Sequence, residues 1–157
     1  MNTTCKHTLQ TLRLCIAAVA LGAIFHACEP IEEPIARHDR PTWAVADTTD
    51  LESTMTITGV LPAALADNAD TADIVAAFAG NDCWGLTNIR YVNDQAYFFL
   101  FVNRPRSNAD SFPLLTLRYY STKTRYIYVE KEVCTFAVDA MIGTIDTPFT
   151  PKFTTTE

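Results

Sequence analysis

The residue best placed for covalent chemistry is Cys28, which ends an apolar stretch near the N-terminus. Lys6 and Arg13 precede an uncharged run over 14–27, and the cysteine follows directly. A basic N-terminal region, a short apolar core and a small residue before the cleavage site are typical of a secretory signal. The run has about fourteen residues, whereas a membrane-spanning helix needs about 20. The sequence therefore predicts a signal peptide over residues 1–27.

A cysteine immediately after Ala27 resembles the signal of bacterial lipoproteins, in which that cysteine is acylated and becomes the mature N-terminus. Phe25 and His26 depart from the usual signal, but relaxed forms are common in lipoproteins of the Bacteroidetes type. Each buried lipid CH₂ contributes ~0.8 kcal/mol, so two or three acyl chains such as palmitate hold stably in a membrane. The resemblance implies lipidation of Cys28, with the lipid bilayer as a partner. The alternative is an ordinary cleaved signal and a coincidental cysteine.

An acidic cluster follows this cysteine. It resembles the export tag that sends such lipoproteins to the outer face of the outer membrane. The resemblance implies an anchored protein that faces the cell exterior, with the periplasmic face as the alternative. Prolines in the same segment favour a flexible, solvated tether, and both descriptions can hold. We expect a tether over 28–50 and one folded domain over 51–157. The residues that define this segment are Glu29, Glu32, Glu33, Pro30, Pro34 and Pro41.

Charge argues against nucleic acid as a partner. Lys6 and Arg13 would leave with the signal, so 10 of the 12 basic residues remain against 18 acidic ones, a net charge of −8. The remaining basic residues are scattered, whereas nucleic-acid binding normally uses a basic face. Apolar residues make up 48% of the chain, which is enough for the core of one domain.

Side chains suited to catalysis are few after residue 28. His38 is the one histidine there, and a tether cannot hold the geometry of a catalytic triad or dyad. Zinc sites need several closely spaced His or Cys ligands, and the five glycines of the chain form no phosphate-binding loop. Spacing alone leaves paired carboxylates for glycoside cleavage open, but the acids lie mostly in expected loops. We expect no enzyme, no metal and no cofactor.

Four oxygen-bearing side chains lie close together before one predicted strand, at Asp67, Asn68, Asp70 and Asp73. Clustered oxygens suit calcium, but this spacing fits no EF-hand loop and lacks the glycine of such a loop. We expect these side chains to cap turns through hydrogen bonds to backbone amides instead.

The cysteine count allows one disulfide. Cys5 and Cys15 would leave with the signal and Cys28 would carry lipid, which leaves Cys83 and Cys134. An even pair in an oxidising compartment is compatible with a bridge. Two buried thiols are the alternative, because both cysteines lie in apolar, strand-like runs and the sequence does not give their separation.

Hydrophobic patterning predicts an all-β domain. Residues 53–61 alternate as a half-buried strand does, and the run over 96–102 is apolar on both sides, as in a central strand. Turn residues recur every 8–12 residues and no segment shows sustained helical periodicity. These features favour an antiparallel two-sheet β-sandwich of immunoglobulin-like type. The strands that we expect cover 53–61, 74–79, 83–89, 96–102, 114–120, 125–129, 134–138 and 149–153.

Several short motifs resemble a β-sandwich module of secreted and surface Bacteroidetes proteins. The match extends from Trp43 to Phe153 and implies a fold and a location but no established activity. That module usually has a basic residue at the position of Trp84 and an aliphatic one at that of Cys134, and the second departure supports a bridge to Cys83. The motifs are Pro41-Thr42-Trp43, STMTITG over 53–59, DIVAAF over 73–78, CWG over 83–85, FAVDAMIG over 136–143, and then Asp146, Pro148 and Phe149.

Alternation also assigns the side chains of each strand to two faces. In the strand over 125–129 it leaves open which pair faces outward, the tyrosines at 126 and 128 or the aliphatic residues at 127 and 129. In the strand over 114–120 the outward side carries Thr116, Arg118 and Tyr120.

Three aromatic residues are candidates for ligand binding. Trp84, Tyr120 and Tyr126 could share one outer sheet face and offer a flat stacking surface to sugar rings or to a partner protein. The alternative is that another part of the chain, such as the stretch around Trp43, covers them.

The sequence as a whole favours a lipid-anchored, non-catalytic binding or structural module of the cell envelope. One alternative is a glycan-binding accessory lipoprotein that uses exposed aromatics. Another is an assembly subunit that donates or accepts an edge strand in a larger surface complex of envelope proteins.

Overall fold

The computed structural model describes residues 35–45, 51–106 and 112–155 of the chain. The expected signal peptide and the expected lipid site, Cys28, lie outside these residues. From Ile35 onward the chain forms one compact unit. Within the described ranges, every helix is too short to cross a membrane.

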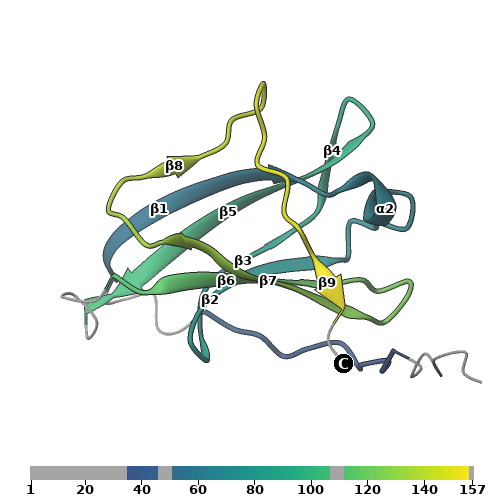
Figure 1. Cartoon of the computed structure of the whole chain (residues 1–157), viewed down its shortest axis with the longest axis horizontal. Coiled ribbons are helices and arrows are strands. Elements are labelled where there is room, and N and C mark those ends of the chain that lie inside the picture. Colours follow the sequence, from purple (N-terminus) through teal and green to yellow (C-terminus); the bar gives the residue numbers. More distant parts are fainter. Residues whose placement is uncertain (1–34, 46–50, 107–111, 156–157) are drawn as a thin grey trace, which may run out of the picture. The chain divides into compact units, whose positions relative to one another are not determined.

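Two β-sheets stack face to face, and the helical turn α2 (Ala63–Ala66) lies in a connection between them (Figure 1). The strands are β1 (Leu51–Val60), β2 (Ile74–Ala79), β3 (Asp82–Asn88), β4 (Arg90–Val92), β5 (Gln95–Pro105), β6 (Leu114–Tyr120), β7 (Ile127–Thr135), β8 (Met141–Ile142) and β9 (Thr154–Thr155). The first sheet has the order β4-β5-β1-β8 and the second β3-β2-β6-β7-β9. The all-β sandwich prediction is confirmed, and its immunoglobulin-like type stays a prediction.

The predicted alternation is confirmed in β1. Met55 and Ile57 are buried in the core, while Thr56 and Thr58, which alternate with them, point to the other face. The expectation for β5 holds in part. This strand lies between β1 and β4, but Phe101 is 62% exposed, so its outer face is not buried as a run of apolar residues had suggested.

The C-terminal strands differ from the prediction. The two strands expected over 125–129 and 134–138 are one strand, β7, because an irregularity in its pairing with β6 accommodates the polar residues between them. The strand expected over 149–153 is a single bridge from Phe149 to Gly59, followed by the short β9. The short parallel pairing of β8 with β1 carried no recognisable sequence signal.

A buried carboxylate, Asp73, joins the ends of two strands. It is 0% exposed, and its Oδ2 accepts hydrogen bonds from the Tyr119 hydroxyl (2.6 Å) and from the backbone N–H of Asp70 (2.9 Å). Its Oδ1 accepts from the backbone N–H (2.8 Å) and hydroxyl (2.6 Å) of Thr122. These four donors satisfy a group that would otherwise be costly to bury. They tie the start of β2 to the end of β6.

Asp70, another of the predicted turn residues, also accepts a hydrogen bond from a backbone amide. Asp70 Oδ1 accepts from the backbone N–H of Ala72 (2.8 Å), as an Asx turn does. Across the described residues, no group of three or more His, Cys, Asp or Glu side chains is arranged to hold a metal. The expectation that Asp70 and Asp73 cap turns is confirmed.

Replacing Asp73 with Ala is expected to lower the free energy of unfolding by about 3 kcal/mol or more, since the Tyr119 hydroxyl and the Thr122 donors would stay buried without an acceptor. Urea denaturation measures the change. Asp67→Ala, at an exposed aspartate of the same loop, is the matched control and should be near neutral. Equal stability of the two variants would contradict the role assigned to Asp73.

A second expectation concerns alkaline pH. Burial, and then the hydrogen bond and negative charge of Asp73, raise the pKa of Tyr119 above its ordinary value of 10. As pH rises above about 10, the Tyr119 hydroxyl therefore ionises in the unfolded chain before it does so in the folded protein. Its contribution to the free energy of unfolding is complete below that pH and is lost progressively above it. Tyr119→Phe should reduce that slope by ~1.4 kcal/mol per pH unit in urea unfolding. Equal slopes in the wild-type protein and in Tyr119→Phe would refute the idea.

Candidate functional site

The outer face of the second sheet carries the candidate site. Thr116 and Arg118 of β6 point outward there, as predicted, because Leu115 and Leu117 between and beside them are fully buried in the core. Arg118 lies opposite Val129 in the β6–β7 ladder. In β7 the aliphatic residues face outward, which settles the alternative that alternation had left open.

Residues 35–45, which we call the strap, lie against this face. The backbone N–H of His38 donates to the carbonyl of Arg125 (2.7 Å), and the carbonyl of His38 accepts from the Tyr120 hydroxyl (3.4 Å). The guanidinium of Arg125 also pairs with Asp39. The strap falls within the tether expected over 28–50, and it belongs to the compact unit that begins at Ile35.

Trp43 holds the other end of the strap. Its indole meets the ring of Phe78 edge to face, with 5.6 Å between ring centroids. Phe78 belongs to a small apolar cluster on the outside of the sheet, against which Trp43 and Val45 pack. A large aromatic residue in an otherwise polar, proline-containing segment was the sequence signal for this docking.

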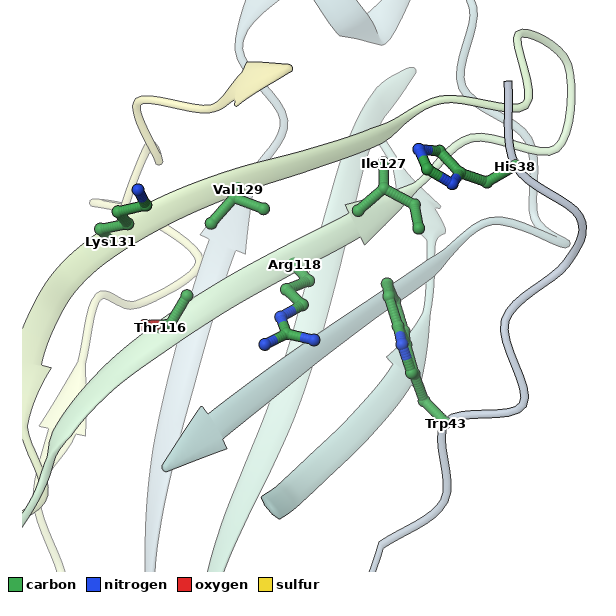
Figure 2. A pocket seen from close by; sticks show the side chains of 7 residues that line it. All are labelled: His38, Trp43, Thr116, Arg118, Ile127, Val129 and Lys131. Carbon is green, nitrogen blue, oxygen red and sulfur yellow. The ribbon is translucent and has the colours of Figure 1, made fainter. Parts of the chain in front are cut away.

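A hollow of about 460 Å³ lies between the strap and strands β6 and β7. Figure 2 shows Trp43 and His38 from the strap at one end and Lys131 of β7 at the other, with Arg118 between them. No carboxylate lines this hollow in the part of the chain that the structure describes. The lining residues are His38, Trp43, Thr116, Arg118, Ile127, Val129 and Lys131.

The charge in the hollow is positive, although the chain has a net charge of −6. The Arg118 guanidinium lies over the ring of Phe78, with its carbon 3.9 Å from the ring centroid. Such a cation–π contact stabilises the guanidinium and fixes its plane. Neither Arg118 nor Lys131 forms an ion pair with any described residue.

The predicted stacking surface of Trp84, Tyr120 and Tyr126 is wrong. Trp84 is 1% exposed and packs in the core, where its indole meets the ring of Phe136 edge to face at 5.6 Å. Tyr126 contacts Tyr128, which packs on the core side of the sheet. Tyr120 does point outward, but it is buried beneath the strap, as the alternative around Trp43 had proposed.

A β-bulge explains the position of Trp84. The pairing of β2 with β3 shifts register between Ala77 and Phe78, so that one extra residue enters β3 and the alternation reverses there. Trp84 and Gly85 therefore both turn inward. A Cβ atom at Gly85 would lie 2.2 Å from the carbonyl oxygen of Phe101, so the two sheets approach closely at this corner.

Cys83 and Cys134 are free thiols, so of the two alternatives that the sequence left open, the one with two thiols holds and the possible disulfide is absent. β2 and β6 separate their strands, which places the backbones about 14 Å apart, whereas a bridge needs less than about 7 Å. The side chains also lie on opposite faces of the sheet, Cys83 in the outer cluster and Cys134 against the core. Burial raises the pKa of both thiols.

The hollow combines an indole, two cationic side chains and an aliphatic floor, which suits a small ligand with both apolar and polar surface. None of its lining residues was predicted as a site residue. His38 and Trp43 lie in the expected tether, and the strand residues form a site only where the strap packs against them. Comparisons of this chain with protein-family models, with curated proteins and with solved structures find no match.

Proposed function

We propose that this protein is a lipid-anchored, non-catalytic binding module of the cell envelope, held in the outer membrane through acylated Cys28 and facing the cell exterior. The signal-like segment before Cys28 supports the anchor. The observation that carries the binding role is the hollow under the strap, with Trp43 as one wall and cationic side chains along its length.

The ligand class that fits this hollow best is a saccharide. Its volume of about 460 Å³ lies within the usual range for small-molecule sites, about 300–1,000 Å³. The indole of Trp43 is an amphipathic surface against which a sugar ring can pack, and Ile127 and Val129 provide an apolar floor. This proposal takes up the glycan-binding alternative from the sequence, with Trp43 as the stacking aromatic in place of Trp84, Tyr120 and Tyr126.

The strand order supports the immunoglobulin-like part of the fold prediction. If β1 corresponds to strand B of that fold, β4-β5-β1 corresponds to D-E-B, and β3-β2-β6-β7 corresponds to C′-C-F-G. The candidate hollow then lies on the outer face of the sheet that contains strands F and G.

Assembly into a larger surface complex is the second candidate function. β9 pairs with β7 at Tyr128 and Val129 alone, so the rest of this strand edge has no partner among the described strands. An open edge can accept a strand from another protein. Co-purification with envelope proteins, lost when a proline replaces Val133, would support this candidate, and recovery of the protein alone would count against it.

The membrane anchor is tested by replacing Cys28 with Ser. We expect the wild-type protein in the detergent phase after phase partition, with a mass increase of acyl chains on its N-terminal peptide. Cys28→Ser should move the protein to the aqueous phase, because the acylated sulfur is lost. Cys15→Ser, within the predicted signal peptide, is the matched control. An unmodified N-terminal peptide in the wild-type protein would refute the anchor.

The binding role is tested by Trp43→Ala on a glycan array and by calorimetry of the best ligand. Truncating a central aromatic anchor should weaken binding about tenfold or more. The control is Phe101→Ala, which removes an exposed aromatic from the other sheet and should leave affinity unchanged. Thermal melts establish that both variants are folded. Binding that survives Trp43→Ala, or that Phe101→Ala abolishes, would place the site elsewhere.

A further inference from the structure

We propose that the hollow selects acidic saccharides, with a sugar carboxylate bound by Arg118 and Lys131 while the ring packs against Trp43. This inference rests on the proposed binding function and adds the charge of the ligand to it. Its basis is the local excess of positive charge in an acidic chain.

Arg118 is preorganised for a carboxylate. Its guanidinium lies on Phe78, and the same ring contacts Trp43, so one aromatic side chain positions both groups. A guanidinium held by its face keeps its N–H edge available, and that edge matches the two oxygens of a carboxylate. The hollow itself supplies no carboxylate to occupy this edge.

Two acids that neighbour lining residues in the sequence have partners outside the hollow. Asp39 of the strap pairs with Arg125, and a carboxylate oxygen of Glu130 accepts from the backbone N–H of Lys152 (2.7 Å). Neither acid lines the hollow. The positive charge of Arg118 and Lys131 is therefore left for a ligand.

The positions of the two cations suit a ring with one charged substituent. Lys131 lies two residues beyond Val129 on the same side of β7, and Arg118 faces Val129 from β6. Residues i and i+2 of a strand are about 7 Å apart, so both cations lie within reach of one sugar unit on the aliphatic floor. A polyanionic saccharide would be repelled by the net negative charge of the rest of the chain. The charge distribution therefore favours a neutral saccharide that carries one carboxylate.

The test uses the full chain in detergent micelles and an array of neutral oligosaccharides that each carry a single uronic-acid residue, paired with their carboxyl-reduced forms. We expect the uronates to bind at least tenfold more tightly than their neutral partners, with an affinity that falls as salt is raised. Equal affinity within pairs would overturn the acidic preference and leave the proposed function standing. Absence of all saccharide binding would overturn both. If the protein instead prefers peptides with a free C-terminal carboxylate, the role of the two cations stands and the proposal that the ligand is a saccharide is refuted.

Variants of Arg118 and Lys131 test whether these two side chains bind the ligand carboxylate. Arg118→Gln and Lys131→Gln should each lower uronate affinity about tenfold and reduce by a similar factor the preference for the uronate over its neutral form. Arg118→Lys should recover only part of the loss, because it restores charge without the planar fork. Lys123→Gln, at an exposed lysine in the turn before β7, is the matched control. Lys131 is exposed, so its variant tests the proposal even if Arg118→Gln proves unstable. Unchanged uronate affinity in both Gln variants would refute the proposal.

Discussion

The buried carboxylate of Asp73 is the interaction on which the arrangement of the second sheet depends. It has no contact with solvent, so its four hydrogen-bond donors must be held in place, and they come from the loop before β2 and from the end of β6. The bond to the Tyr119 hydroxyl keeps that side chain on the core side. Because neighbouring residues of a strand face opposite ways, Tyr120 and Arg118 are then turned to the outer face. The same carboxylate thus stabilises the core and orients the strand that bears the candidate site.

The candidate site is formed by segments that are far apart in the sequence. The strap contributes the indole and the imidazole, β6 contributes the guanidinium, and β7 the aliphatic floor and an ammonium. Two contacts keep the strap in register with the strands, the His38 bond to Arg125 and the aromatic contact of Trp43 with Phe78. A ligand that touches both the strap and β7 binds only the docked strap, so by mass action its binding favours docking.

A single irregularity in strand pairing decides which aromatics are available to a ligand. The bulge in β3 directs Trp84 into the core, where it contributes to packing with Phe136. Without the bulge, this indole would lie outside, on the same face as Phe78. The outer face instead receives its indole from Trp43, and the space beside it stays open as the hollow. Binding capacity and core packing therefore depend on the same register shift.

The sequence by itself determined the all-β class, the alternation of β1, and the outward direction of Thr116 and Arg118. These features depend on local periodicity and turn residues, which are visible in the order of the amino acids. Only the tertiary structure decided the inward position of Trp84, the separation of Cys83 from Cys134, and the docking of the strap. A bulge reverses alternation without a clear local signature, and strand order and long-range contacts arise from the packing of segments that the sequence does not place side by side.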